Sequence, residues 1–125
     1  MTGINPLKFY PIVFCTIVAA CADFQEPQAL DPRPYLGCYG GYGNELVIDI
    51  NSLRVNEKRF DYIIEEHKVG LVLAISAIFS SDDNILQAHS SDRHFYRILD
   101  RSDGVAVRIV DQSARVFDLS KTSCL

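Results

Sequence analysis

Apolar residues recur at every second position through most of the chain after Pro34, and this alternation limits the possible folds more than any other feature. Side chains of a β-strand point alternately to its two faces, so a period of two predicts strands with one buried face. In residues 45–50, Leu46, Ile48 and Ile50 share one face. Residues 69–79 are almost all apolar, which predicts a central strand buried on both faces. Similar patterns predict strands in residues 59–65, 93–99, 105–109 and 116–119.

Glycine, asparagine, aspartate and serine gather between these runs and mark turns. The step Asp103-Gly104, between two alternating segments, is a strong hairpin signal. The sequence therefore predicts an all-β fold, a small antiparallel β-barrel or sandwich of about seven to eight strands, because short strands at this spacing are typical of those architectures. One alternative stays open, since the apolar residues of the segment 60–67 also fit one face of a helix.

The prolines divide the chain into two parts. All five lie at or before position 34. Residues 21–34 are polar and Pro-rich, and because a residue before proline is disfavoured in a helix, they predict an extended tether. Residues 35–125 are left as the antiparallel β domain, and the whole chain has 125 residues, a length that suits a single domain.

The beginning of the chain has the organisation of a secretory signal. Lys8 precedes a run of 14 residues without charge, 9–22, which ends in small residues. A helix rises 1.5 Å per residue, so this run is too short to cross a hydrocarbon core of about 30 Å. We therefore expect residues 1–20 to be a signal peptide and the mature chain to be exported.

The end of that run is more specific. Val18-Ala19-Ala20-Cys21 resembles the lipobox of bacterial lipoproteins, in which a branched apolar residue and two small residues precede a cysteine. The resemblance implies cleavage before Cys21, lipidation of its thiol and acylation of the new amino terminus, and several acyl chains hold a protein durably on a membrane. Ala22 follows the cysteine, and in two-membraned bacteria this implies the outer membrane.

Two other interpretations of Cys21 stay open. Ala20-Cys21-Ala22 also fits the A-x-A site of ordinary signal peptidase, and cleavage after Ala22 would release a soluble periplasmic or secreted protein. Alternatively, Cys21 is simply a small apolar residue of the run, as we expect Cys15 to be.

Two of the four cysteines remain for the mature domain, Cys38 and Cys124, near its opposite ends. Because disulfides persist outside the cytosol, an exported protein is expected to join this pair. Zinc binding is the alternative, although the sequence has no C-x-x-C motif and no nearby histidine cluster with zinc spacing. A pair of free buried thiols is the remaining possibility.

Residue types that carry out catalysis or bind metals are scattered. His89, Asp92 and His94 form the densest group, but their spacing matches no standard zinc chelate, and the segment predicts a polar loop. The sequence has no G-x-S-x-G elbow and no phosphate-binding loop. We therefore predict no catalytic residues, no metal and no cofactor.

A binding surface is the more promising prediction. Tyr39 and Tyr42 flank flexible glycines, and tyrosine offers a large rigid contact area with a polar end. The alternative is that Tyr39 lies in the core and Tyr42 packs across the hairpin. Arg93, Arg97 and Arg101 would share one face of a strand, although acidic neighbours along the chain favour a solvated face.

The expected function is that of an envelope protein. Leu36-Gly37-Cys38-Tyr39 resembles the G-x-Y start of small lipocalin-like barrels, which implies a barrel and no particular binding residue. A net charge of −4 gives no basic surface for nucleic acid. We expect a lipid-anchored cell-envelope protein, a non-catalytic binding or structural module held to the membrane through Cys21 and contacting another envelope protein. The alternative is a secreted or periplasmic ligand carrier, inhibitor or small enzyme.

Overall fold

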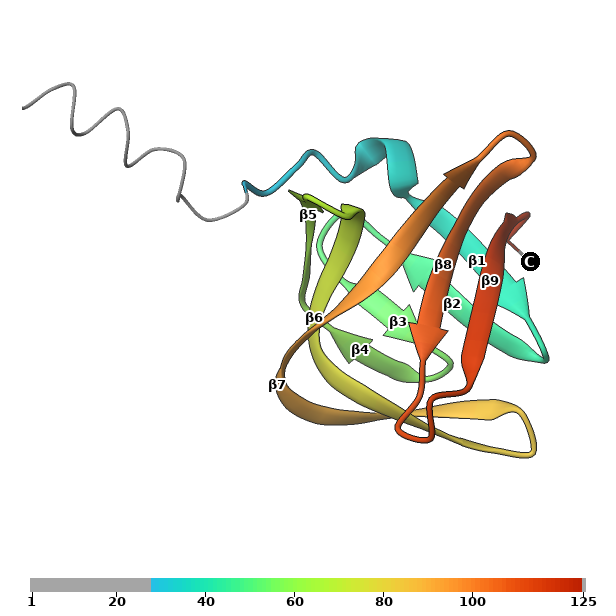
Figure 1. The fold of residues 1–125 in the computed structure, drawn as a ribbon. Coiled ribbons are helices and arrows are strands. Elements are labelled where there is room, and N and C mark those ends of the chain that lie inside the picture. Colours follow the sequence, from blue (N-terminus) through green and yellow to red (C-terminus); the bar gives the residue numbers. More distant parts are fainter. Residues whose placement is uncertain (1–27, 125) are drawn as a thin grey trace, which may run out of the picture.

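Nine strands form one antiparallel sheet that curves into a nearly closed barrel (Figure 1). The computed structural model describes residues 28–124. This part of the chain contains no α-helix, and a single 3-10 turn, η2 (Arg33–Tyr35), precedes the first strand. The strands are β1 (Gly37–Gly41), β2 (Asn44–Ile48), β3 (Leu53–Val55), β4 (Lys58–Phe60), β5 (Tyr62–His67), β6 (Gly70–Asp82), β7 (Ile85–Arg101), β8 (Gly104–Val110) and β9 (Val116–Thr122).

The sheet is a meander that closes between its first and last strands. Its order is β4-β3-β2-β1-β9-β8-β7-β6-β5, so every neighbouring pair except β1 and β9 is consecutive in the chain. β1 and β9 pair antiparallel through Cys38↔Thr122 and Gly40↔Ser120. The open seam lies between β4 and β5, which are joined in the chain by Asp61 alone.

The predicted all-β class and antiparallel barrel are confirmed, but the strand count is nine rather than seven to eight. Residues 59–65 form two strands instead of one, because Asp61 separates β4 from β5 at the seam. β3 has only 3 residues, too few for an alternation to be visible in the sequence. The helical alternative for residues 60–67 is wrong, since β5 pairs with β6 from Tyr62↔Ile75 to His67↔Gly70.

The two longest strands, β6 and β7, leave the barrel wall at their far ends. Their register shifts between Ile75 and Ala77, and an irregularity of this kind bends a strand pair. Beyond it, residues 77–90 form a hairpin arm that runs across the lower end of the barrel in Figure 1. β7 pairs with β8 only from Arg97↔Arg108 onward, so the arm lies outside that ladder.

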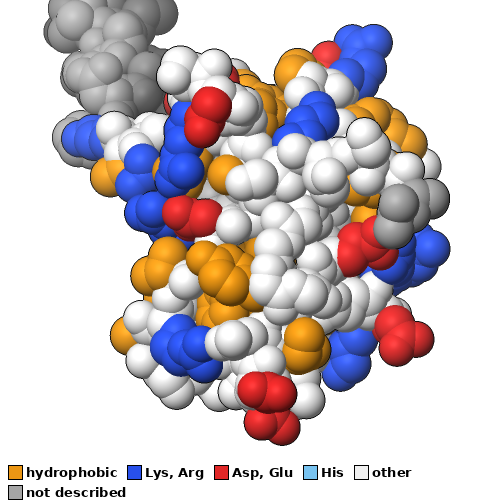
Figure 2. Space-filling model, turned by 90° about the vertical axis from the view of Figure 1, so that its right-hand side faces the viewer, with side chains coloured by type: hydrophobic (Ala, Val, Ile, Leu, Met, Phe, Trp, Pro, Cys, Tyr) orange, Lys and Arg blue, Asp and Glu red, His pale blue; other side chains and the backbone are white. Residues whose placement is uncertain are grey.

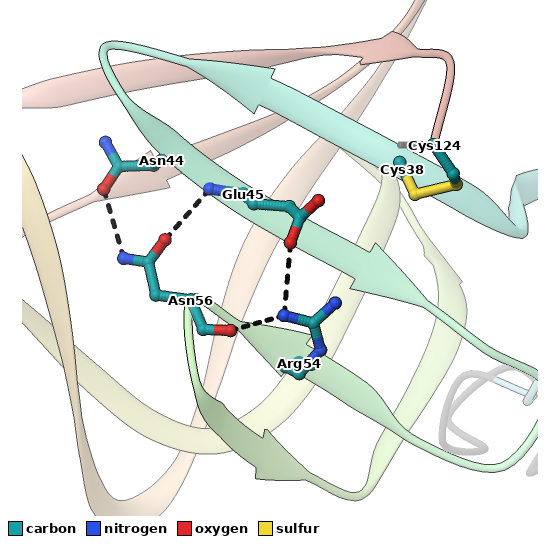
Figure 3. A network of polar contacts seen from close by, with 6 residues as sticks. All are labelled: Cys38, Asn44, Glu45, Arg54, Asn56 and Cys124. Atoms are coloured by element: carbon teal, nitrogen blue, oxygen red, sulfur yellow. Dashed lines mark hydrogen bonds and ion pairs between the residues drawn. A yellow bond between two sulfur atoms is a disulfide. The ribbon is translucent and has the colours of Figure 1, made fainter.

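Two asparagines hold the hairpin arm against the β2–β3 side of the barrel. Asn44 Oδ1 accepts the backbone N–H of Leu86 at 2.7 Å, and Asn44 Nδ2 donates to the Asn84 carbonyl at 2.9 Å. Asn56 Nδ2 donates to the Leu86 carbonyl at 2.9 Å and to Asn44 Oδ1 at 3.2 Å. Figure 3 shows the two asparagines facing each other, with Asn56 also bound to Glu45. Both backbone groups of Leu86 are therefore satisfied by side chains.

Apolar side chains fill the interior of the barrel. Tyr39, Phe79 and Phe117 are the largest fully buried side chains, and the rings of Phe79 and Tyr96 meet edge-on with centroids 5.2 Å apart. Burying a side chain of this size stabilises the fold by roughly 1.5–3 kcal/mol. The rest of this core comprises Leu46, Ile48, Leu53, Val55, Ile64, Leu73, Ile75, Ala77, Leu86, Ala88, Ile98, Val107, Ile109 and Leu119.

A disulfide joins Cys38 and Cys124, the pair predicted from the sequence (Figure 3). The two Cα atoms are 5.3 Å apart, within the usual range for this bond. Cys38 lies in β1 and Cys124 follows β9, so the bond reinforces the point where the barrel closes. It connects residues that are separated by 86 positions in the chain.

The chain contacts the barrel before β1 begins. Ala29 forms a β-bridge with Glu65, and the Leu30 N–H donates to the Ile64 carbonyl at 2.7 Å. The described part of the predicted tether, residues 28–34, therefore touches the domain that a tether would hold at a distance. The predicted signal peptide and Cys21 lie outside the described residues. Within residues 28–124, no helix has the length and apolar character needed to span a membrane.

Candidate functional site

The two tyrosines predicted as a binding pair lie in different environments. Tyr39 is 0% exposed and its hydroxyl donates to the Tyr35 carbonyl at 2.7 Å. Burial raises the pKa of Tyr39 to about 12. Tyr42 is 57% exposed in the β1–β2 turn, and its ring meets Phe117 edge-on at 5.4 Å. A role in surface binding stays a prediction for Tyr42, because the Tyr39 side chain belongs to the core.

The polar loop predicted for residues 89–94 is wrong, because these residues lie within β7. The segment passes from the hairpin arm to the barrel wall with its side chains exposed on both faces, so no apolar alternation marks it as a strand. His89 Nε2 lies 2.8 Å from Ser80 Oγ. Across residues 28–124, no three side chains of His, Cys, Asp or Glu are arranged to hold a metal ion.

β7 carries basic and aromatic side chains in alternation on the outer wall. Phe95 and Arg97 point outward because Tyr96 and Ile98, which alternate with them, are buried in the core. The Arg93 guanidinium lies 5.8 Å from the centre of the Phe95 ring, and Phe95 is 52% exposed. Arg93, Arg97 and Arg101 therefore lie at alternate positions of one strand, as predicted, and Phe95 lies between the first two.

A buried carboxylate supports this aromatic ring. Glu65 of β5 is only 7% exposed, forms an ion pair with Arg93 and lies within hydrogen-bond distance, 2.8 Å, of His67 Nε2. The His67 and Phe95 rings have centroids 5.1 Å apart. Arg93 and His67 therefore both lie against Phe95, and both contact Glu65.

A hollow of about 330 Å³ opens on the outer wall where β7 turns away from β8. The pairing of these strands ends at Arg97↔Arg108, whereas β8 continues to Val110 and pairs there with β9. We call this space the outer-wall hollow. Its lining consists of Ile78, Phe79, His94, Phe95, Tyr96, Arg97, Arg108, Val110, Asp111 and Gln112.

An apolar row crosses the outer wall on both sides of the hollow. The register aligns Ile63 with Ala74 and Ala74 with Phe95, and on the far side it aligns Val110 with Val116. Four of these five side chains are exposed large hydrophobics, and Ala74 is the exception. The hollow interrupts the row between Phe95 and Val110.

A charged row lies beside the apolar row, and its charges are not fully paired. Arg97 and Arg108 are register partners, but the Arg97 guanidinium reaches over β6, where its Nη2 lies 3.7 Å from the position that a Cβ of Gly70 would occupy. Asp118 binds Arg108 through two hydrogen bonds of 2.8 and 2.9 Å, and Arg101 at 3.1 Å. The hydrogen bonds from Arg108 hold the pKa of the Asp118 carboxyl below its ordinary value. Within the described residues Arg97 forms no ion pair.

Asp111, the carboxylate in the lining of the hollow, accepts three hydrogen bonds from neighbouring groups. Asp111 Oδ1 accepts the backbone N–H groups of Ser113 at 2.9 Å and Arg115 at 2.8 Å, while Oδ2 accepts the Ser81 hydroxyl at 2.5 Å. The hydrogen bond from Ser81 is the main reason that the pKa of Asp111 lies below its ordinary value. Asp111 therefore stays charged, and within the described residues it forms no ion pair with Arg97.

The face of the molecule drawn in Figure 2 carries charges of both signs. Figure 2 shows basic and acidic side chains interspersed over one face of the molecule, with apolar side chains exposed between them.

No protein-family model, curated protein or solved structure matches this chain. The geometry of the site suits noncovalent binding, because the Arg93 guanidinium lies against the exposed Phe95 ring. Sequence reasoning missed Phe95 and Val110. The alternation in residues 93–97 contained a signal for Phe95, but the register that places Val110 across the hollow joins distant segments of the chain.

Proposed function

We propose that this chain is an exported, lipid-anchored cell-envelope protein whose barrel is a non-catalytic binding module for another envelope protein. The observation that carries the proposal is the Cys38–Cys124 disulfide, because such bonds persist in oxidising compartments outside the cytosol. The motif Val18-Ala19-Ala20-Cys21 supports an anchor at Cys21, and Ala22 supports the outer membrane.

The packing of the barrel supports binding on its outside. Barrels that carry small ligands hold them in an internal cavity, whereas Tyr39, Phe79 and Phe117 fill the interior of this one. The outer wall instead exposes Phe95 beside Arg97, and aromatic residues and arginine are enriched in protein interfaces.

Metabolic labelling with an alkyne analogue of palmitate tests the anchor. The wild-type protein should take up the label and begin at Cys21, and Cys21→Ser should lose the label because the acceptor thiol is gone. Cys15→Ser is the matched control, since it removes a cysteine from the same apolar run and should label normally. Equal labelling of Cys21→Ser and wild type would contradict the anchor. An unlabelled soluble protein that begins after Ala22 would favour the secreted or periplasmic alternative.

Site-specific photo-crosslinking in the native envelope tests the binding role. A photoreactive amino acid at Phe95 should form a discrete adduct with one envelope protein. The same amino acid at Ile50, which is exposed between β2 and β3 and outside the lining of the hollow, should not. Identical adducts from both positions would contradict a binding site at the hollow.

A further inference from the structure

The chain reaches the barrel next to the β5–β6 turn, residues 67–70. Ala29 forms an antiparallel bridge with Glu65, two positions before this turn. In an antiparallel pair the chain before one residue lies beside the chain after the other, so Gln28, the first described residue, leads from Ala29 toward the turn. Figure 1 shows the turn at the same end of the barrel as η2. The end of the barrel that lies nearest to Cys21 along the chain is therefore the end that carries the β5–β6 turn.

The chain between Cys21 and this bridge is short. Eight positions separate Cys21 from Ala29, and a fully extended chain spans at most about 3.6 Å per residue, so the two residues cannot be more than about 29 Å apart. A domain of about 100 residues has a radius of gyration of about 13 Å, so this reach is close to the width of the domain. An acylated Cys21 would therefore hold this end of the barrel beside the membrane surface.

The turn exposes one apolar side chain beside two positive charges. Val69 is 63% exposed, more than any other large hydrophobic side chain of the described residues. Lys68 precedes it, and the Arg97 guanidinium reaches over β6 to Gly70. Within residues 28–124 neither Lys68 nor Arg97 forms an ion pair.

The two carboxylates that precede the turn lie apart from these cations. Glu65 is bound by Arg93. Glu66 lies on the same face of β5 as the buried Ile64, whereas Arg97 points outward from β7. β5 therefore supplies no carboxylate to the cations of the turn, which remain available to an anionic surface.

From these features we propose that the β5–β6 turn docks on the membrane that holds Cys21, with Val69 among the lipid headgroups and Lys68 and Arg97 against anionic lipids. The inference rests on the lipid anchor proposed above and adds the orientation of the barrel and the class of lipid that it contacts. Basic side chains beside an apolar one are attracted to the interface of an anionic bilayer, and this attraction adds to that of acyl chains.

Paramagnetic broadening of NMR signals in lipid nanodiscs tests the proposal. The lipidated protein is inserted through its own acyl chains into nanodiscs of phosphatidylethanolamine and phosphatidylglycerol that contain a lipid with a nitroxide headgroup. The amides of Lys68 and Val69 should lose the most signal, and the amide of Tyr42, in the β1–β2 turn at the opposite end of the barrel, should lose several-fold less. In nanodiscs of phosphatidylcholine alone the loss at Val69 should fall, because the anionic headgroups are gone.

Variants separate docking from proximity to the anchor. Val69→Ser should lower the equilibrium constant for docking about tenfold, because the apolar contact is lost, and Lys68→Gln should lower it about fivefold, because one cation near the surface is lost. Val116→Ser and Arg59→Gln are the matched controls, since they change an exposed valine and an exposed arginine away from the turn and should leave the broadening as in wild type. Broadening that is unchanged in Val69→Ser and Lys68→Gln, or equal at both ends of the barrel, would overturn the proposal.

Two further measurements separate the docking from the anchor and from other partners. An anchored protein whose turn shows no localised broadening rejects the docking and leaves the lipid anchor standing, whereas a Cys21 that takes up no palmitate label rejects the anchor and the docking with it. A photoreactive amino acid at Val69 should crosslink to lipid in the native envelope. A crosslink to protein alone would assign the turn to a partner protein and overturn the proposal.

Discussion

The two halves of the β6–β7 hairpin are held by different kinds of bonds. In the barrel wall, β6 pairs with β5 and β7 pairs with β8 from Arg97 onward, so both outer edges belong to backbone ladders. In the hairpin arm, residues 77–90, the outer edges meet other groups. Asn44, Asn56 and Lys58 bind the β7 edge, and the Gln112 N–H donates to the Phe79 carbonyl at 2.8 Å.

This difference indicates where the molecule opens first. The hydrogen bonds of a backbone ladder join main-chain groups, so a substitution of one exposed side chain removes none of them. The arm shares the core through Phe79 and Leu86, but its outer edges are held by a few hydrogen bonds instead of a ladder, and regions with fewer such contacts open locally with less free energy than the whole fold. The outer-wall hollow lies where the two halves meet, beside the register shift between Ile75 and Ala77.

Removal of the disulfide should have the largest effect, and it should lower the global stability without changing the local opening of the arm. In Cys38→Ala/Cys124→Ala, loss of a bond across 86 positions should lower the free energy of unfolding by roughly 4–5 kcal/mol in the chain-entropy model. Chemical denaturation measures this change. Hydrogen exchange at the Leu86 amide should still report the same local opening of the arm, because the bond joins β1 to the residues after β9.

The outcome at Leu86 decides whether the two halves behave independently. If exchange there speeds up in proportion to the global destabilisation, the wall and the arm open together and the comparison fails. Reduced wild-type protein should reproduce the result and serves as the control for the two substitutions.

Asn44→Ala should have the next largest effect, and it should act on the arm. The Leu86 N–H and the Asn84 carbonyl would lose their partner, and an unsatisfied buried group costs about 1–3 kcal/mol, so we expect a loss near 3 kcal/mol. Exchange at Leu86 should accelerate more than exchange in the β8–β9 ladder. Asn51→Ala, at an exposed turn position, is the control and should stay within about 0.5 kcal/mol of wild type.

Substitution at Asn56 distinguishes side-chain bonds from backbone strain. Asn56 has φ of 52°, a conformation that glycine adopts freely and alanine does not. Asn56→Gly should therefore destabilise the arm through the lost bond to Leu86, and Asn56→Ala should add the cost of strain. Equal stability of the two variants would mean that the left-handed conformation contributes nothing.

The sequence predicted what depends on local alternation and missed what depends on distant register. Leu46, Ile48 and the residues around Leu73 showed their strands directly, and the compartment argument paired Cys38 with Cys124. The hairpin arm was missed because Asn44 and Asn56 look like ordinary turn residues, and their bonds reach Leu86, which lies 42 positions from Asn44 and 30 from Asn56. The hollow was missed for the same reason, since no local pattern places Val110 opposite Phe95.

Two buried tyrosines provide the smallest and most local test of the comparison. The Tyr96 hydroxyl donates to the Ala77 carbonyl at 2.7 Å, where the arm leaves the wall, whereas the Tyr39 hydroxyl donates to the Tyr35 carbonyl of η2, far from the arm in the chain. Burial raises the pKa of each from 10.0 to about 12. Because the folded state favours the neutral form, each tyrosine contributes stability that is fully present below pH 10 and is lost as the pH rises toward 12.

Denaturation at pH 8 and pH 11 measures this contribution. Between these conditions each tyrosine should account for about 1.4 kcal/mol of lost stability, so Tyr39→Phe and Tyr96→Phe should each lose that much less than wild type. Other titrating groups are common to all three proteins and cancel in the differences. A smaller difference for Tyr96→Phe than for Tyr39→Phe would show that water reaches the junction of arm and wall. Equal differences would show that the junction is as well sealed as the barrel, which would place the weak point of the molecule at the asparagine contacts alone.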